Sequence, residues 1–140
     1  MPQNFESDNS KLILIGEDDL DDQEFLNEIF SSIDPSFSIE FAANGSELLS
    51  YLDDNSHKHL PCLILLDYNM PGLNGVEILK ELKSRERYDA IPKIIWSTSK
   101  STNYKDVCLQ LGAHEYLVKP SNVNDLTEIC RYMLNTCISS

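Results

Sequence analysis

The sequence has few basic residues, no long apolar run and no paired cysteine spacing, and each shortage excludes a class of protein. Only 11 Lys and Arg residues oppose 23 Asp and Glu residues, which gives a formal net charge of -12. This charge repels nucleic-acid backbones and anionic lipid headgroups. No apolar run approaches the roughly 18 residues of a membrane helix, and residues 1–10 lack the features of a signal peptide. We therefore expect neither nucleic acid nor a membrane as a partner.

The cysteines show no CxxC motif and no Cys/His pairing typical of a zinc site. All four lie in apolar stretches; they are Cys62, Cys108, Cys130 and Cys137. Isolated cysteines in apolar surroundings are typical of reduced core thiols. The sequence therefore predicts four free thiols in a cytoplasmic protein.

Strand-like segments alternate with helical stripes five times along the chain. The segments with strand character are 11–15, 38–42, 60–67, 91–97 and 116–118. The helical residues expected to face the core are Phe25, Leu26, Ile29, Phe30, Ile33, Leu48, Leu49, Leu52, Val76, Leu79, Leu82, Tyr104, Val107, Cys108, Leu111, Val123, Leu126, Ile129, Cys130, Met133 and Leu134. Asp34-Pro35 is expected to end the first helix and Gly112 to cap the fourth. This alternation predicts a parallel sheet with right-handed crossovers and helices on both faces.

An uninterrupted aliphatic run, residues 63–66, leads directly to Asp67 and is followed by the turn signal Met70-Pro71-Gly72. Such a run is typical of a strand that is covered on both faces of a parallel sheet. Ligands bind such sheets at the carboxyl ends of the strands. Asp67 is therefore expected to stand at the edge of the sheet where chemistry occurs.

Other strand ends supply companions to Asp67: Glu17 and Asp18 end the first strand, Ser97 the fourth and Lys119 the fifth. Crowded carboxylates favour a hard divalent cation such as Mg²⁺. A lysine ammonium is a common partner of phosphate oxygens, and a hydroxyl can donate a hydrogen bond to them. Together these groups predict a magnesium-assisted site in which a carboxylate accepts a phosphoryl group.

Taken together, these motifs resemble the response-regulator receiver domain of two-component signalling, similar to the single-domain chemotaxis regulator. The resemblance covers residues 11–137 and rests on Glu17-Asp18 and the segments 67–72, 95–97 and 116–120. It implies an α/β, doubly wound (βα)5 flavodoxin-like fold, a three-layer sandwich with a parallel sheet of strand order 2-1-3-4-5. Residues 1–10 are expected to be a flexible tail, and the chain end directly after the last helix predicts no output domain.

The resemblance also implies roles for the residues at the sheet edge. Asp67 matches the phospho-acceptor, and the Mg²⁺ ligands match Asp18, Asp67 and the backbone carbonyl of Asn69. Glu17 matches a residue that acts on the metal mainly through water, while the third acid, Asp19, is expected to cap the helix that follows.

Three further positions match the family's switch and its phosphate-binding lysine. Ser97 matches the switch hydroxyl and Tyr116 the switch aromatic. Lys119-Pro120 matches a peptide bond that is cis in the family, which would aim the ammonium into the pocket. Gly16, where a larger aliphatic residue is common, and the bulky Trp96 depart from the family pattern and concern packing rather than chemistry.

The resemblance predicts a phosphorylation-controlled switch rather than an enzyme with turnover, because the domain would catalyse only its own phosphorylation and autodephosphorylation. A sensor histidine kinase or phosphotransfer protein would donate the phosphoryl group to Asp67. Output would pass to a downstream protein or to self-association through the face of the fourth helix, fifth strand and fifth helix. The loop expected at residues 53–61 is longer than in the chemotaxis type, and in this it resembles single-domain regulators that pair with phytochrome-like kinases.

Three other kinds of protein compete with this interpretation, one of them an enzyme and two of them binding proteins. An Asp-nucleophile phosphohydrolase usually carries a second acid two residues after the nucleophile, where this chain has Asn69. A pseudo-receiver that binds proteins without phosphorylation would not need Asp18, Asp67, Ser97 and Lys119 together. A flavodoxin-like cofactor binder would need a Gly/Ser/Thr-rich phosphate loop after the first strand, which the sequence lacks.

Overall fold

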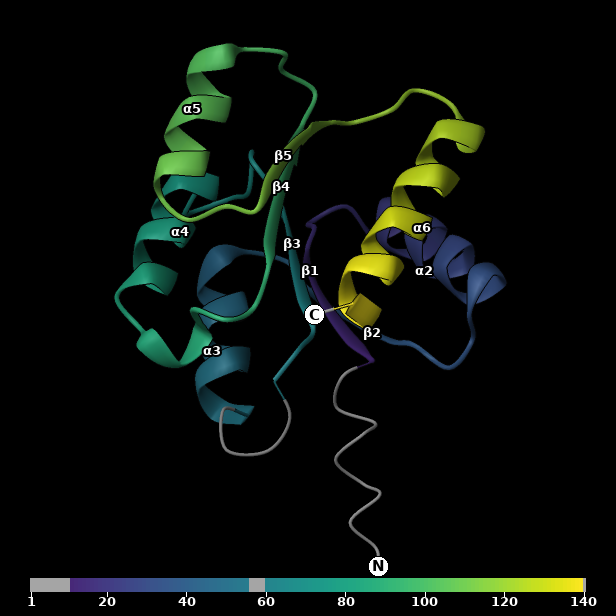
Figure 1. Cartoon of the computed structure of the whole chain (residues 1–140), viewed down its shortest axis with the longest axis horizontal. Coiled ribbons are helices and arrows are strands. Elements are labelled where there is room, and N and C mark those ends of the chain that lie inside the picture. The colour runs from purple at the N-terminus through teal and green to yellow at the C-terminus, as the bar shows by residue number, and fades with distance from the viewer. Residues whose placement is uncertain (1–10, 56–59, 140) are drawn as a thin grey trace, which may run out of the picture.

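The computed structural model describes residues 11–55 and 60–139, and the predicted tail (residues 1–10) lies outside the described residues. Strands and helices alternate along the described chain as the sequence predicts (Figure 1). The elements are β1 (Leu12–Gly16), α2 (Leu20–Ile33), β2 (Ser38–Ala42), α3 (Gly45–Asn55), β3 (Leu63–Asp67), α4 (Gly75–Lys83), the short 3-10 helix η1 (Glu86–Tyr88), β4 (Lys93–Ser97), α5 (Thr102–Gln110), β5 (Glu115–Val118) and α6 (Val123–Ser139).

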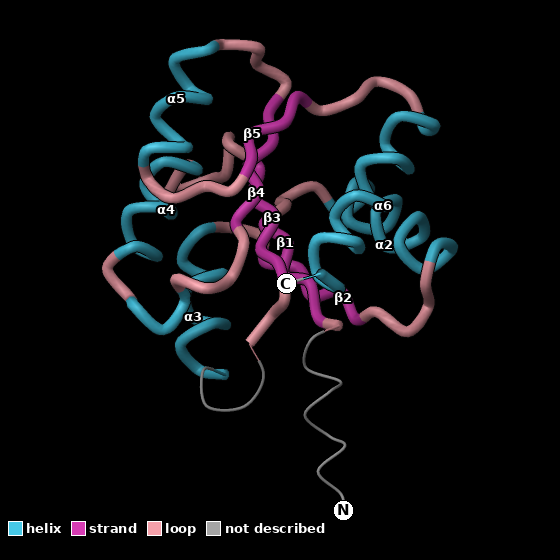
Figure 2. Tube along the Cα trace, viewed as in Figure 1, coloured by secondary structure: helices cyan, strands magenta, loops and turns pink. Residues whose placement is uncertain are grey.

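The sheet has the order β2-β1-β3-β4-β5, and every neighbouring pair of strands is parallel. Seen nearly edge-on, the sheet separates two layers of helices, with α3, α4 and α5 on one side and α2 and α6 on the other (Figure 2). The predicted doubly wound three-layer fold with strand order 2-1-3-4-5 is therefore confirmed. The strand order reverses between β1 and β3, and such a switch point opens a crevice at the carboxyl ends of the strands.

Two apolar cores lie on opposite faces of the sheet because successive side chains of a strand point to opposite sides. In β3, Ile64 and Leu66 join the core under α3, α4 and α5, whereas Leu63 and Leu65 join the core under α2 and α6. All residues of β3 and β4 are buried. The carboxyl ends of these two central strands are therefore held rigidly from both sides.

Prolines shift the starts of two strands from the predicted positions. β3 begins at Leu63 rather than at residue 60, and β4 begins at Lys93 rather than at residue 91. Pro61 and Pro92 lie just before these starts and have no N–H group to donate to a neighbouring strand. The ladder therefore begins after each proline.

The predicted helix signals are confirmed. Asp19 caps α2, since its side chain accepts a hydrogen bond from the backbone N–H of Asp22. α2 ends at Ile33, before the extended residue Asp34. Gly112 follows α5 with a φ of 100°, the left-handed conformation that favours glycine at a helix end. Among the described residues, no helix is long and apolar enough to cross a membrane.

Four residues predicted to face the core are exposed instead: Phe25, Tyr104 and Val107 at 40% each and Val123 at 54%. Val123 is the first residue of α6, and at this end of the helix only part of its side chain is covered by neighbouring residues. α5 packs on β5, the edge strand of the sheet, so a narrower stripe of this helix is covered than the sequence pattern indicates. The helical period was right, but the width of the buried stripe was overestimated.

The prediction of four reduced thiols is wrong, because Cys62 and Cys137 form a disulfide with a Cα–Cα distance of 5.1 Å. Cys62 lies just before β3, and α6 runs back along the sheet toward that end, which brings its last turn to Cys62. Cys108 and Cys130 are free and buried. Burial raises the pKa of Cys108 to about 11 and that of Cys130 to about 12, so both remain protonated thiols at neutral pH.

Candidate functional site

Asp67 ends β3 at the edge of the sheet and is only 7% exposed. The Lys119 ammonium donates a hydrogen bond of 2.6 Å to Asp67 Oδ2. The backbone N–H of Asn69 donates to Asp67 Oδ1 at 3.0 Å. Each carboxylate oxygen of Asp67 therefore has a donor, and one of these donors carries a full positive charge.

Glu17 follows β1 and is 2% exposed, so its carboxyl group lies deeper than the other acids at this edge. Glu17 Oε2 accepts from the backbone N–H of Asp19 at 3.2 Å, and Oε1 lies 3.6 Å from the Lys119 Nζ. Among the described residues, Oε1 has no hydrogen-bond partner. Burial raises the pKa of Glu17, opposed by the Asp19 N–H and the Lys119 charge. A buried oxygen without a donor is suited to accept from water that is held at this edge.

Lys119 stands between the carboxyl groups of Glu17 and Asp67, and its Nζ lies 5.3 Å from the centre of the Trp96 ring. Burial opposes its charge, but the hydrogen bond and negative charge of Asp67, with the charge of Glu17, raise the pKa of Lys119 above its usual value. The side chain is therefore a stable ammonium at neutral pH. Its direct contact with both acids confirms that the strand ends converge.

The Lys119–Pro120 peptide bond differs from the cis form that the resemblance implies. No peptide bond among the described residues is cis, so this bond is trans here. The backbone N–H of Lys119 donates to the carbonyl of Ser97 at 2.8 Å, which fixes the end of β5 beside β4. From this anchored position the long lysine side chain reaches Asp67 with a trans bond.

The structure brings the predicted metal ligands only partly together. Asp18 and Asn69 are exposed, whereas Glu17 and Asp67 are buried. Within the part of the chain that the structure describes, no three His, Cys, Asp or Glu side chains are close enough to hold a metal ion. The predicted set needs only Asp18 and Asp67 as direct side-chain ligands together with a backbone carbonyl and water, and it stays a prediction.

The two residues predicted as a switch lie on the neighbouring strands. Ser97, which ends β4, is fully buried, and its Oγ accepts from the backbone N–H of Ser99 at 3.0 Å. Tyr116 of β5 is 7% exposed and donates its hydroxyl to the carbonyl of Ser99 at 2.9 Å. Ser97 and Tyr116 thus both hold the backbone of Ser99, which the sequence indicated only as a turn residue.

Gly16, one departure from the family pattern, lies where Met70 approaches the end of β1. A Cβ atom at Gly16 would lie 2.9 Å from Met70 Cε and 3.3 Å from the side chains of Leu48 and Leu66. The flexible Met70 side chain therefore occupies the space that an aliphatic side chain would fill, and the core stays packed.

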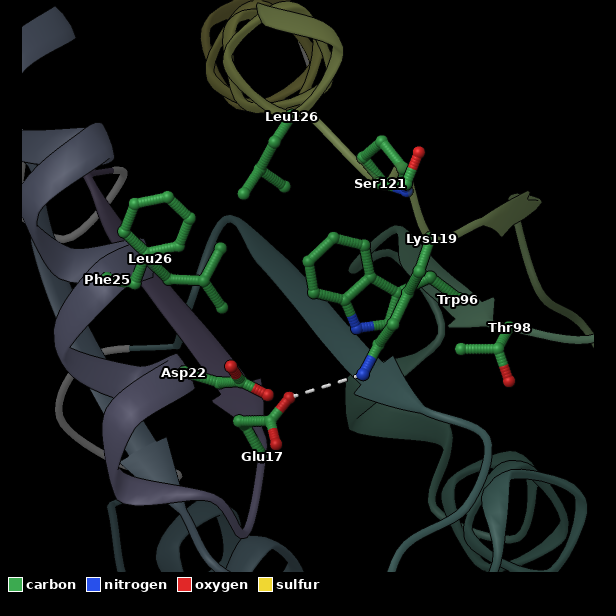
Figure 3. A pocket seen from close by; sticks show the side chains of 10 residues that line it. Glu17, Asp22, Phe25, Leu26, Trp96, Thr98, Lys119, Ser121 and Leu126 are labelled. Carbon is green, nitrogen blue, oxygen red and sulfur yellow. Dashed lines mark ion pairs between the residues drawn. The ribbon is translucent and has the colours of Figure 1, made fainter. Parts of the chain in front are cut away.

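Sequence reasoning missed a pocket of about 380 Å³ beside Lys119, between α2 and α6 (Figure 3). Its apolar wall includes Phe25 and Leu26 of α2, Trp96 of β4 and Leu126 of α6. The signal in the sequence was the bulky Trp96, which lines this space. Glu17 and Lys119 of the charged site also line this pocket, so another molecule can reach the charged site from the side of α2.

The chain matches the model of the response regulator receiver domain over residues 13–131. It therefore belongs to the family of response regulator receiver domains, whose general function is phosphorylation on an aspartate within two-component signalling. The chemotaxis protein CheV2 of Helicobacter pylori is 32% identical over 127 residues, which cover 91% of this chain and 40% of CheV2. The chain thus spans less than half the length of that relative.

Solved structures of response regulators share the fold along most of its length. The crystal structure of the phosphorylated cyanobacterial phytochrome response regulator RcpA has a TM-score of 0.82 at 27% identity, covering 92% of this chain and 94% of RcpA. The Mn²⁺-bound form of the response regulator Rcp1 has a TM-score of 0.77 at 26% identity, covering 88% of this chain and 91% of Rcp1. The predicted family and fold are confirmed.

Proposed function

We propose that Asp67 is the phospho-acceptor of this receiver domain. The observation that carries the proposal is the 2.6 Å contact between the Lys119 ammonium and Asp67 Oδ2 at the buried edge of the sheet. A carboxylate in this position is held rigidly by β3, and an ammonium beside it can neutralise the oxygens of an incoming phosphoryl group. Because Lys119 is already in place, little reorganisation is needed during transfer.

The transfer is a direct displacement at phosphorus. One carboxylate oxygen of Asp67 forms the new O–P bond while the N–P bond of a donor phosphohistidine breaks, and the electron pair of that bond returns to the imidazole. Lys119 moves its hydrogen bond from the carboxylate to a phosphoryl oxygen. Hydrolysis of the acyl phosphate by water would return Asp67 to its free form, so the domain catalyses only changes to itself.

We propose Mg²⁺ as the cofactor, held by Asp18, Asp67 and the backbone carbonyl of Asn69, with Glu17 acting through water. Hard oxygen ligands and several retained waters suit Mg²⁺, and the buried Glu17 Oε1 without a donor suits one of those waters. When bound, the ion would supply positive charge that, together with Lys119, neutralises phosphoryl oxygens. The Mn²⁺-bound form of Rcp1 supports a divalent cation in this family.

We propose that Ser97 and Tyr116 carry the signal to the face formed by α5, β5 and α6. This face exposes apolar side chains at 38–40% of their surface: Tyr104, Val107, Leu109, Val118 and Tyr132. Exposed apolar groups of this kind suit a downstream protein or a second copy of the chain. A change in the backbone of Ser99, which both switch residues contact, would alter the start of α5 and hence this face.

The proposed phosphodonor is a sensor histidine kinase or a phosphotransfer protein. RcpA is a phytochrome response regulator, and this likeness favours a kinase of the phytochrome type. Residues 53–55 belong to the end of α3 rather than to the loop expected at 53–61, and residues 56–59 lie outside the described residues. A cytoplasmic location stays a prediction.

The phosphohydrolase alternative lacks a residue for its chemistry. Such an enzyme needs an acid two residues after the nucleophile to protonate the leaving group, and Asn69 cannot donate a proton in this way. Multiple turnover of a phosphate ester by the purified protein would favour the phosphohydrolase over the switch.

Incubation with acetyl phosphate and Mg²⁺ tests the proposed function. We expect intact-mass spectrometry to show one added phosphoryl group on the wild type and none on Asp67→Asn, which has the same shape but a poor nucleophile. Chelation of the divalent cation should also prevent the addition. Equal modification of the wild type and Asp67→Asn would contradict the assignment of Asp67.

A further inference from the structure

Two tyrosine rings stack beside the phospho-acceptor. The centres of the Tyr68 and Tyr104 rings are 4.6 Å apart, and the ring planes differ by 13°. Tyr68 directly follows Asp67, and its backbone is fixed on both sides: its N–H donates to the carbonyl of Trp96 at 2.8 Å, and its carbonyl accepts from Gly75 at 2.9 Å. The Tyr68 ring therefore extends from a fixed point to Tyr104, which lies in the first turn of α5.

A series of hydrogen bonds joins Tyr104 to Ser97, the predicted switch serine. The backbone N–H of Ser99 donates to Ser97 Oγ at 3.0 Å, and that of Ser101 donates to Ser99 Oγ at 3.1 Å. The backbone N–H of Tyr104 donates in turn to Ser101 Oγ at 3.4 Å. Tyr104 thus contacts Tyr68, the neighbour of Asp67, through the stacked rings, and it is joined to Ser97 through the serine hydrogen bonds.

This arrangement is the one present when Asp67 is unphosphorylated, because Lys119 contacts the free carboxylate directly. Ser97 is fully buried, and its Oγ already holds the backbone of Ser99. Movement of Ser97 toward a phosphoryl group would displace Ser99, and through the serine series it would shift the first turn of α5. Such a shift would change the contact between Tyr104 and Tyr68, because the backbone of Tyr68 is fixed.

We propose that the Tyr68–Tyr104 stack acts as a latch, by which we mean a contact that stabilises the arrangement with a free Asp67 carboxylate. The stack would therefore weaken phosphoryl binding at Asp67. Tyr104 is a positioning residue in this scheme, since it acts through Ser97 and does not touch the reacting atoms. The proposal rests on the proposed function of Asp67. From the usual strength of an aromatic pair, removal of the stack should tighten phosphoryl binding by about 2- to 12-fold.

The latch is tested by isothermal titration of beryllofluoride, a phosphoryl mimic, in the presence of Mg²⁺. Tyr104→Ala is expected to bind beryllofluoride about 2- to 12-fold more tightly than the wild type. Tyr104→Phe keeps the ring and should bind like the wild type. Tyr104→Leu, which keeps an apolar side chain without a ring, should bind like Tyr104→Ala. Tyr104 is 40% exposed, so these substitutions leave the core intact.

A second titration separates a latch from a general loss of packing. The affinity for Mg²⁺ alone should be the same in all four proteins, because Tyr104 is not a proposed metal ligand and the backbone of Tyr68 keeps its hydrogen bonds to Trp96 and Gly75. Equal or weaker beryllofluoride binding by Tyr104→Ala, or tighter binding by Tyr104→Phe, would overturn the latch and leave the proposed function standing. Failure of the wild type to bind beryllofluoride would instead overturn the proposed function itself.

Discussion

Replacement of Lys119 by alanine is expected to slow the phosphorylation of Asp67 by about 100- to 1000-fold, the usual effect of losing one hydrogen-bond donor at a reacting oxygen. Lys119 Nζ is 2.6 Å from Asp67 Oδ2 and 3.6 Å from Glu17 Oε1. Within the described chain, no other Lys or Arg side chain forms an ion pair with either of these acids. Its loss leaves two neighbouring buried carboxylates without a counter-charge and an incoming phosphoryl group without its ammonium partner.

The rate is measured with acetyl phosphate and saturating Mg²⁺ by the appearance of the phosphorylated mass. Lys100→Ala is the matched control, because Lys100 is an exposed lysine that follows β4 at the same end of the sheet. The control should keep a rate within about twofold of the wild type. A Lys119→Ala rate in that same range would show that the ammonium has no part in the transfer.

Reduction of the Cys62–Cys137 disulfide is expected to lower the free energy of unfolding by about 4 kcal/mol. The two cysteines are 75 residues apart in the sequence, so the disulfide closes a long loop and restricts the unfolded chain strongly. The measurement is denaturant unfolding of the wild type with and without a reductant. Thiol titration of the unfolded protein should give two free thiols before reduction and four afterwards.

The control for this prediction is the double variant Cys62→Ala, Cys137→Ala. Its unfolding curve should not respond to the reductant, and its free energy of unfolding should lie near that of the reduced wild type. If the oxidised and reduced wild-type proteins unfold at the same denaturant concentration, the disulfide does not stabilise the fold.

The architecture follows from local patterns that survive in the sequence. The alternation of aliphatic runs with helical stripes predicts the parallel sheet, and cap signals such as Asp19 and Gly112 mark real helix ends. The starts of two strands were wrong because the aliphatic pattern continues across Pro61 and Pro92, whereas the backbone ladder cannot use a residue without an N–H. The width of a buried helical stripe depends on which strand lies beneath it, and this is a property of the assembled sheet.

The charged centre of the site was predictable because parallel strands end at one edge, which brings Asp67, Lys119 and Glu17 together over long sequence separations. Contacts between residues that lie far apart in the sequence and have no characteristic spacing were not predictable. The Cys62–Cys137 pair depends on how far α6 runs back along the sheet, and the Tyr68–Tyr104 stack depends on the position of α5. Neither pair leaves a local mark in the sequence.

The identity of the phosphorylated residue is the most direct test of the function proposed for this site. Borohydride reduces an aspartyl phosphate to homoserine, so treatment after incubation with acetyl phosphate and Mg²⁺ marks the acceptor chemically. Peptide mass mapping is expected to find homoserine at position 67 alone. Homoserine at another aspartate, such as Asp18 or Asp19, or an unmodified Asp67 in a protein that carries phosphate, would contradict Asp67 as the acceptor.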